Sequence, residues 1–550
     1  MKTYKRVLVT GSLTCLSDLH IGDGDLTLQS ERDVPPSAPR AESKRTTDNS
    51  NRAKVLFRPP ETEKKEEKKS EGSYNTVCRD YQNRAYIPGS TLRGSLASFL
   101  NRETSFYRKF FGYADEEAKN TLAARQAGLL RIYDARLQED PKKEQGFSTL
   151  PGFSQERHTF LRHSVSISPV TGTAAKGKLF CYELVPKGSV FTVQFQIESQ
   201  NKAQAEKLTE EESAQLLALT EQWNSRVAAI GSGVTKGYGR IQWETERIEV
   251  LTSDEELCWL ESDSLEPPPM MSITDAAQPA DINALLSEAG SDGGKDTAPL
   301  KFKLDILPDG PFLINEPEYV QDKSKQGEKE VFPVLEYSRN GRNGKKAEAL
   351  IPARTLAGAI RGRARRILAT IAHQYYDVSE DTAADTAESV VKEFFGSEER
   401  KGALRLTEAR GEAEQHIQNF IGVDRFTGGV NDGANYKVRA AACKKLSTED
   451  CLLDRHLLPA EDWWKGMLLL VLLDGMDGDM QVGWGKAKGY GRMAFQLQYN
   501  GKIFADRKKL LDEIKEVIGT ETAKKWVQAL HDRIQRNVKV NEAAATGGQA

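Results

Sequence analysis

The sequence predicts an α+β protein made of two homologous domains in tandem, each with a ferredoxin-like, RRM-like core in which helices pack on an antiparallel sheet. Three observations support this fold class. The chain has 550 residues, more than one hydrophobic core usually holds. Several motifs occur twice in the same order. Strand-like segments with alternating apolar and polar residues flank a helical segment in each copy.

The duplication rests on four motifs, each of which recurs about 250 to 285 residues later. An Ile-Pro turn with a following Thr-Leu opens a helical segment, and Phe-Phe-Gly comes after it. A strand-like segment is next, and a glycine-rich loop containing Lys-Gly-Tyr-Gly-Arg closes the copy. The pairs are YIPGSTLRGSL (86–96) and LIPARTLAGAI (350–360), FFG (110–112) and FFG (394–396), GLLRIYDARL (128–137) and GALRLTEAR (402–410), and GSGVTKGYGR (231–240) and GWGKAKGYGR (483–492).

This order of motifs divides the chain into a first domain at residues 1–250 and a second at 300–540. Between them, residues 251–299 contain eleven acidic residues, one basic residue and several Pro and Gly, which predicts a flexible acidic linker. The linker contributes −10 to the net charge of −3, so the rest of the chain sums to +7 (−3 + 10) and is modestly basic. The polar segment 541–550 is predicted to be a disordered tail.

Local patterns predict the elements within each domain in order. The segments 5–16 and 300–307 alternate apolar and polar residues, as does the first strand of a sheet with one solvated face. After the first Ile-Pro turn, Leu92, Leu96 and Phe99 have helical spacing, and Ser90 or Thr91 is placed to cap that helix. The glycine loop then leads into the last strand.

Two kinds of insertion interrupt this pattern. Residues 26–72 are charged and poor in apolar side chains, which predicts a mobile loop. Residues 162–192 contain a Pro-Val-Thr-Gly turn between two strand-like runs, which predicts a long projecting hairpin. Residues 421–440 are the expected counterpart in the second domain.

Composition excludes several classes of protein. The longest apolar run, Met467 to Leu473, is far shorter than the roughly 20 residues of a membrane span, and the alternating N-terminal segment differs from a signal peptide. The six cysteines are scattered without a CxxC pair, which favours a reduced, cytoplasmic location and argues against zinc. We therefore expect a globular cytoplasmic protein without a membrane partner.

The glycine loops are the first candidate binding sites. Glycines let backbone amides approach a phosphate, lysine and arginine add positive charge, and a tyrosine ring offers a stacking surface. Neither loop is a Walker A motif, because each leads into a strand instead of a helix. For one such loop, a simple turn before a strand explains the residues equally well, but two with cations at equivalent positions favour contact with nucleic acid. The candidates are Gly231, Gly233, Lys236, Gly237, Tyr238 and Arg240 in the first loop and Lys486, Lys488 and Arg492 in the second.

The Ile-Pro turns are the second candidate. Each turn starts a predicted helix, where free amides and the helix dipole favour an anion. Ser90 and Arg93 lie at this position in the first domain and Arg354 in the second. Arg361 and Arg365 follow at helical spacing and extend the positive face, although a solvated helix surface explains that pair equally well.

Together these motifs resemble the RAMP superfamily. The resemblance covers the strand with LHIGDG (19–24), the turn CRDYQNRAYIPGSTLRGSL (78–96), the hairpin rich in small residues and the closing glycine loop. Within that superfamily, the motifs more specifically resemble the backbone subunits of type III CRISPR effector complexes. Two such domains in one chain are similar to the fused subunits of the type III-D group.

The resemblance implies the partners and the remaining site residues. Each domain would hold guide RNA, with its hairpin inserted along the duplex of guide and target RNA, beside other RAMP subunits. Lys176, Lys178 and Arg425 in the hairpins and His20 near the first strand would then contact RNA. His20 is equally a candidate general base or a structural histidine.

Many members of the family cleave target RNA with a metal-dependent aspartate before the Ile-Pro turn. Here Tyr74 and Val331 occupy the corresponding positions, so the acid has to come from nearby loops. The candidates are Asp23 and Asp25, which would also bind Mg²⁺ or another divalent metal, and Asp322 in the second domain. Ordinary solvated loop acids are the alternative for each.

Three other functions stay open. The first is a purely structural backbone that binds guide RNA without nuclease activity, and the missing aspartate favours it. A second alternative is a guide-processing RAMP endonuclease, which would need a clearer histidine site. A third is an assembly adaptor that uses its basic surface to bind an acidic protein.

Overall fold

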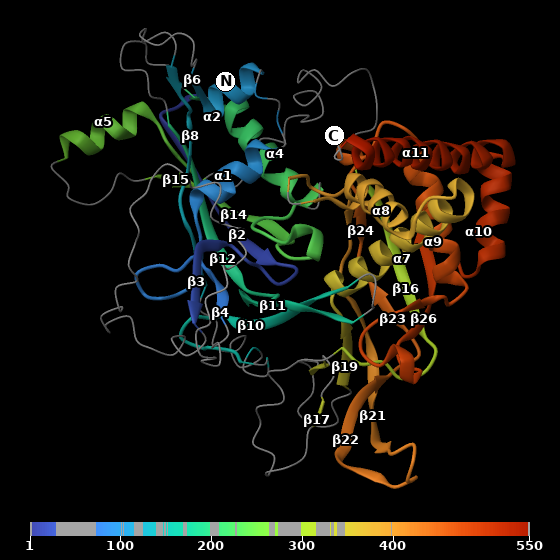
Figure 1. Cartoon of the computed structure of the whole chain (residues 1–550). Helices are drawn as coiled ribbons and strands as arrows, with labels where there is room; N and C mark the ends of the chain where they lie inside the picture. The colour runs from blue at the N-terminus through green and yellow to red at the C-terminus, as the bar shows by residue number, and fades with distance from the viewer. Residues whose placement is uncertain are drawn as a thin grey trace.

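The computed structural model describes residues 3–547, apart from 29–72, 115–124, 139–146, 199–207, 263–269, 273–298, 315–329, 338–346 and shorter stretches. It shows a mixed α+β protein with several antiparallel sheets, as the sequence predicts. The two largest hydrophobic cores among the described residues form from residues between Tyr4 and Val250 and from residues between Leu304 and Val538. We call these parts the first and second halves; they lie side by side in Figure 1.

An antiparallel sheet forms the centre of the first half. Its first long strand, β2 (Arg6–Cys15), has strands on both sides, and Val7, Val9 and Leu13 on one face are buried. This alternation follows from the two-residue period of a strand. The spatial order is β15 (Met271–Ser272), β14 (Ile241–Leu251), β2, β12 (Val190–Glu198), β9 (Ala135–Leu137) and β5 (Tyr86–Ile87), with β8 (Leu130–Ile132) also paired to β12.

Three helices belong to the first core: α1 (Gly89–Ala97), α2 (Ser105–Phe111) and α4 (Glu210–Ser225). Leu92 and Leu96 of α1 are fully buried, as their spacing predicts. The predicted cap is wrong, because Pro88 is the N-cap and neither Ser90 nor Thr91 caps the helix. The carboxylate of Asp134 instead accepts a hydrogen bond from the amide of Gly89 at 2.7 Å, which satisfies a free helix N–H from outside the helix.

The second half repeats this arrangement around β16 (Leu300–Pro308). This strand pairs with β26 (Arg492–Tyr499) on one side and with β23 (Leu446–Thr448) and β24 (Cys451–Leu453) on the other. The remaining strands are β20 (Leu404–Arg405), β21 (Ala409–Val423), β22 (Val430–Ala442), β19 (Ala347–Ile351), β18 (Leu335–Tyr337), β17 (Glu330–Val331), β25 (Met480–Gln481) and β27 (Lys502–Phe504).

Helices are more numerous in the second half and gather on one side of it (Figure 1). They are α7 (Ala353–Tyr376), α8 (Glu380–Phe395), α9 (Trp463–Met476), α10 (Arg507–Glu513) and α11 (Thr520–Gly547). In α7, Leu356, Ile360, Ala364 and Leu368 recur every four residues and are buried, which fixes its inner face. The longest apolar run of the sequence, 467–473, lies within α9.

A hairpin projects from each half. In the second, β21 and β22 extend well beyond the sheet (Figure 1), with the turn between Val423 and Val430. In the first, β10 (Phe160–Ile167) pairs with β11 (Ala174–Leu184), and β4 (Ser73–Val77) and β3 (Gly22–Leu28) continue that sheet. The first hairpin ends earlier than the predicted residue 192, because the segment from Val190 onward is β12 of the central sheet.

Two helices occur where the sequence predicts flexible chain. Helix α5 (Ser253–Glu261) lies in the predicted linker, and a capping box of Thr252 and Glu255 starts it. Helix α11 continues to Gly547, into the predicted tail 541–550, where an alanine-rich sequence favours helix. The insertion 26–72 lies almost wholly outside the described residues. Within the part of the chain that the structure describes, no helix is long and apolar enough to cross a membrane.

Candidate nucleic-acid interface

The two glycine loops have the same backbone. Each contains a short 3-10 turn, η3 (Val234–Lys236) or η6 (Lys486–Lys488), between glycines with positive φ. The four φ values are 79°, 73°, 89° and 77° in the first loop and 78°, 75°, 83° and 75° in the second. Side chains other than hydrogen are disfavoured at such angles, and a Cβ at Gly239 or Gly491 would also clash with a backbone carbonyl. Glycine is therefore required for the shape of both loops.

The loop amides have less freedom than the sequence suggests. The amides of Lys236 and Tyr238 donate to the carbonyl of Gly233, and that of Gly239 donates to Asp18. In the second loop, Lys488 and Tyr490 donate to Gly485 in the same way. These N–H groups hold the turn together, so a ligand at either loop would contact mainly its side chains.

A lysine joins each loop to a strand of its hairpin. The ammonium of Lys236 lies 4.9 Å from the ring centroid of Tyr182 on β11 and donates to its hydroxyl at 3.0 Å. The equivalent Lys488 lies 4.9 Å from the ring centroids of Phe420 on β21 and Tyr436 on β22. The loop and the hairpin thus form one unit in each half, held partly by cation–π contacts.

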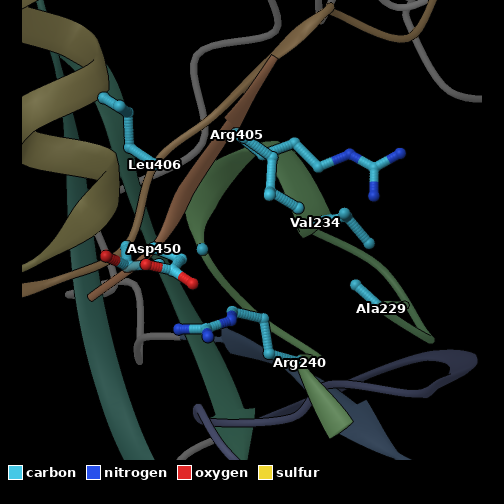
Figure 2. Close-up of a pocket in the computed structure, with 9 residues that line it drawn as sticks. Ala229, Val234, Arg240, Arg405, Leu406 and Asp450 are labelled. Carbon is cyan, nitrogen blue, oxygen red and sulfur yellow. The ribbon is translucent and has the colours of Figure 1, made fainter. Parts of the chain in front are cut away.

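The first loop packs against the second half. A Cβ at Gly237 would clash with Ala353, the first residue of α7, and lie 3.2 Å from the carbonyl of Leu406. The same atom at Gly489 in the second loop would meet nothing within 4 Å. A small pocket remains at this junction, lined by Val234, Arg240, Arg405, Asp450 and neighbouring residues (Figure 2).

Arg354 strengthens the same junction. It follows the second Ile-Pro turn, yet its guanidinium donates to groups of the first half: the hydroxyl of Ser164, the carbonyl of His163 at 2.5 Å and the hydroxyl of Tyr238 at 3.2 Å. Tyr238 is 6% exposed, and burial raises the pKa of its hydroxyl although Arg354 opposes that rise. Arg354 and Tyr238 therefore connect the two halves.

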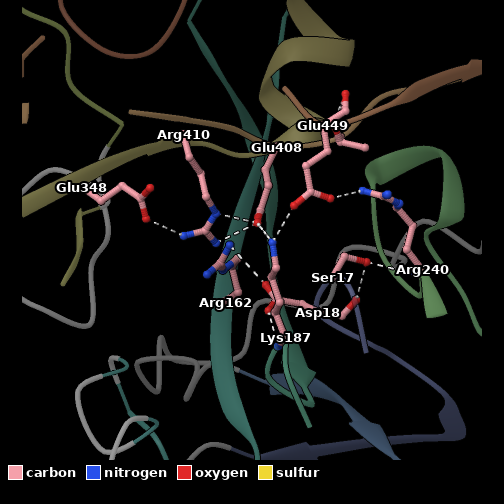
Figure 3. A network of polar contacts seen from close by, with 10 residues as sticks. Ser17, Asp18, Arg162, Lys187, Arg240, Glu348, Glu408, Arg410 and Glu449 are labelled. Atoms are coloured by element: carbon pink, nitrogen blue, oxygen red, sulfur yellow. Dashed lines mark hydrogen bonds and ion pairs between the residues drawn. The ribbon is translucent and has the colours of Figure 1, made fainter. Parts of the chain in front are cut away.

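Ion pairs complete the junction (Figure 3). Glu449 of the second half accepts from Arg240 at 2.7 Å and from Lys187 at 3.0 Å, and Lys187 also lies 3.6 Å from Glu408. Burial alone would raise the pKa of the Glu449 carboxyl, but Lys187 and Arg240 outweigh it and hold that pKa below its ordinary value. Arg240, which the sequence predicts to bind RNA, is thus paired with a carboxylate of the protein itself.

Other predicted cations make contacts within one half. Arg93 donates to the carbonyls of Leu130 at 2.9 Å and Phe111 at 2.5 Å. Arg361 and Arg365 both pair with Glu388, at 3.0 and 3.2 Å. These contacts fix the helices α1 and α7 to their surroundings.

Some of the predicted RNA-binding residues are exposed to solvent. Ser90 is exposed at the start of α1, and Arg425 is exposed in the turn of the second hairpin. Lys486 and Lys488 are exposed on the second loop. Arg492, also exposed, lies 3.4 Å from Asp309. Lys176 and Lys178 are on β11, but their side chains lie outside the described residues.

The candidate acids are only partly described. Asp23 is exposed on β3, and its carboxylate accepts a hydrogen bond from Thr76 at 2.5 Å. The side chain of Asp25 and all of Asp322 lie outside the described residues. Among the residues that are described, no three His, Cys, Asp or Glu side chains are grouped to hold a metal ion. Asp23 alone supplies one carboxylate, which suits Mg²⁺ bound mostly by phosphate oxygens and water.

His20 is buried beside the first loop. It is 4% exposed, and burial is the main cause that lowers its pKa, so the ring is neutral near pH 7. Its Nδ1 donates to the carbonyl of Glu183 at 2.7 Å, which places the proton on Nδ1 and leaves Nε2 as an acceptor. The ring also packs edge-on against Tyr182.

Several residues at these surfaces could not be predicted from any local sequence pattern. Lys187, Glu408 and Glu449 are ordinary charged residues there, because nothing local shows that distant segments meet. Trp484 carried a weak signal: it replaces Ser232 between two glycines of otherwise similar loops.

Comparison with known proteins identifies the family. A family model described as "RAMPs: RAMP superfamily" matches residues 12–242 and 340–494, one region in each half. These regions cover more than half of the chain, so the chain belongs to the RAMP superfamily. Comparison with curated proteins gives no match.

Proposed function

We propose that this RAMP-superfamily chain is a backbone subunit of a type III CRISPR effector complex of the III-D kind, in which it binds guide RNA and positions complementary target RNA. Membership of the family suggests a CRISPR-associated role in RNA binding. The observation that carries the proposal is the duplicated loop-and-hairpin unit, which in the second half presents exposed Lys486, Lys488 and Arg492 beside a projecting hairpin. Its six free cysteines are compatible with a reduced cytoplasmic location.

We infer that both halves are ferredoxin-like, RRM-like domains. In the first half the central strands stand in the order β14, β2, β12, β9, which is fourth, first, third and second along the chain. In the second half β26, β16, β23 with β24, and β20 with β21 have the same order. Helices α1 and α4, or α7 and α9, fall between the first and second and between the third and fourth strands. This is the βαββαβ order, and a sheet of this kind supports RNA binding in many proteins.

The hairpin of the second half fits a role along a nucleic-acid duplex. Phe426 in its turn is 97% exposed, and Ile421, Val423 and Val430 beside the turn are each more than half exposed. Exposed apolar side chains on a thin projection are unfavourable in water unless a partner covers them. We propose that RNA bases cover them and that Arg425 contacts the adjoining phosphates.

Filter binding of single-stranded RNA over a salt series tests RNA binding. Phosphate contacts release counterions, so the logarithm of the association constant should fall linearly with the logarithm of salt concentration, by about 0.7 for each contact. The triple variant Lys486→Ala, Lys488→Ala, Arg492→Ala should have a slope shallower by up to about 2. An association constant that does not change with salt contradicts the proposal and favours the adaptor alternative.

Cleavage of target RNA at Asp23 is a second candidate function. The observation in its favour is an exposed carboxylate, held by Thr76, in the segment that follows the first strand and close enough to affect the pKa of His20. A divalent metal bound there would activate a ribose hydroxyl or stabilise the leaving oxygen. Metal-dependent cleavage by the assembled complex should lose a cut in Asp23→Ala, with Asp80→Ala as the control. If Asp23→Ala still cuts at every wild-type position, Asp23 is not a catalytic residue and the alternative of a structural backbone is favoured.

We also propose that another RAMP domain binds at the second glycine loop. Within the chain, the first glycine loop packs on the Ile-Pro turn of the second half through Gly237 and Ala353. The second loop has the same backbone with open space at Gly489. A neighbouring RAMP subunit would place its own Ile-Pro turn there. Gly489→Trp should weaken assembly of the complex, and assembly at the wild-type level would contradict this arrangement.

A further inference from the structure

The second glycine loop carries an aromatic cluster at its surface. Trp484 stands on the loop, and Phe420 and Tyr436 are paired residues of the hairpin strands β21 and β22. The rings of Phe420 and Tyr436 stack 5.3 Å apart with an interplanar angle of 14°. Trp484 meets them edge to face at 5.9 and 6.3 Å, and all three rings are half-buried. The ammonium of Lys488 lies 4.8 Å from the ring centroid of Trp484.

The indole of Trp484 is not needed to form the loop. Ser232 has the same position in the first loop, where the flanking glycines have nearly the same φ angles. The amides of Ser232 and Trp484 each donate at 2.8 Å to an equivalent carbonyl, of His20 and Leu313 respectively. A serine therefore supports this backbone, and the large ring adds an aromatic surface that packs on one side against Tyr490.

The position also stays accessible when such a loop is docked. Ser232 is exposed even though its loop packs against Ala353 of the second half. A second loop docked in the same way on another domain would leave Trp484 accessible. Binding at Trp484 and assembly at Gly489 would therefore use different sides of one loop.

We propose that Trp484, together with Phe420 and Tyr436, is a stacking site for one unpaired nucleobase of RNA. The proposal rests on RNA binding by this chain and names the part of RNA that this loop takes. The base would lie on the aromatic rings, while Lys486 and Lys488 meet the phosphates beside it. Stacking on an aromatic side chain tolerates any base, because every base has a π face.

The ammonium of Lys488 has to move for this to happen. It now lies over the three rings, where a cation–π contact at an exposed position is weak, and it donates a hydrogen bond to the hydroxyl of Tyr436. A phosphate oxygen is a negatively charged acceptor, so its hydrogen bond with the ammonium is stronger than the bond to the neutral hydroxyl of Tyr436. The long side chain can turn toward the phosphate and leave the ring faces to the base. The positive charge around the cluster favours a phosphate-bearing ligand over an apolar protein segment.

The test measures binding of two single-stranded RNAs by the full chain. One is an oligouridylate, and the other has the same length and charge but abasic sites in place of the bases. Trp484→Leu should weaken binding of the oligouridylate about tenfold and leave binding of the abasic strand unchanged. Trp484→Phe should keep most of the affinity, and the remote Trp259→Leu on α5 is the matched control.

The outcomes separate this proposal from RNA binding itself. Equal affinity of the wild type and Trp484→Leu for the oligouridylate overturns the stacking site and leaves RNA binding intact. Failure of the wild type to bind either strand overturns both. If Trp484→Leu does not fold, photo-crosslinking with 5-iodouridine RNA decides: a crosslink to Trp484 or Phe420 is expected, and crosslinks found only elsewhere contradict the proposal.

Discussion

The two glycine loops share a sequence motif and a backbone, but their surroundings give them different contacts. In the first, Gly237 packs on Ala353, Tyr238 is buried beneath Arg354, and Arg240 pairs with Glu449 of the other half. In the second, the equivalent side of the loop is open, and the cations are exposed. A duplicated motif thus fixes the geometry of both copies, while the neighbours of each copy decide which groups remain for a ligand.

The largest expected effect comes from filling the docked side of the first loop. Gly237→Ala adds a methyl group that clashes with Ala353 at a φ of 89°. We expect it to lower the free energy of unfolding by about 2 to 4 kcal/mol, from the unfavourable φ and the overpacking together. Gly489→Ala has a φ of 83° but open space, so it should cost only about 1 kcal/mol. Equal costs, measured by chemical denaturation, would mean that the first loop is not docked in solution.

Removal of Arg354 should have the next largest effect. The variant Arg354→Ala loses three hydrogen bonds to the first half and leaves Tyr238 buried without this donor. We expect a loss of about 2 to 3 kcal/mol and a less cooperative thermal unfolding curve. Arg366→Ala, an exposed position of the same helix, is the control and should change stability by less than about 0.5 kcal/mol. If Arg354→Ala lowers RNA affinity while the halves stay docked, Arg354 contacts RNA, as the sequence predicted.

A smaller and pH-dependent effect is expected at Glu449. Its lowered pKa means that its pairing stabilises the docked state above the ordinary value of 4.5, and this stabilisation is lost as pH falls below 4.5. Because the side chain is 49% exposed, Glu449→Gln should cost less than about 1 kcal/mol at pH 7. The difference in melting temperature between wild type and variant should shrink toward zero on acidification. A difference that stays constant from pH 7 to pH 4 would show that the charge of Glu449 does not contribute.

The sequence predicted the features that depend on local patterns. The duplication, the α+β class and the first strands followed from repeated motifs and from two-residue alternation, and β2 and β16 lie where expected. The cap of α1 did not follow, since it comes from Asp134, far along the chain. The end of the first hairpin was also missed, because β12 has the same alternating pattern as the hairpin strands.

The contacts that each predicted site residue makes could not be predicted from the sequence. Arg240 and Arg492 stand at equivalent places in the same motif, yet only Arg240 has a carboxylate of the other half within 2.7 Å. That partner, Glu449, lies 209 residues away along the chain. Contacts between distant segments leave no local pattern, so the sequence gives the chemistry of a cation but not what it pairs with.

The affinity for single-stranded RNA of two matched sets of variants tests the central claim most directly. One set is Lys486→Ala, Lys488→Ala and Arg492→Ala in the second loop, and the other is Lys236→Ala and Arg240→Ala in the first. Our account predicts that the second-loop set weakens binding at least tenfold and flattens its salt dependence, while the first-loop set changes RNA affinity by less than about twofold and lowers stability instead. Equal losses of RNA affinity in both sets, or a loss only in the first-loop set, would contradict it.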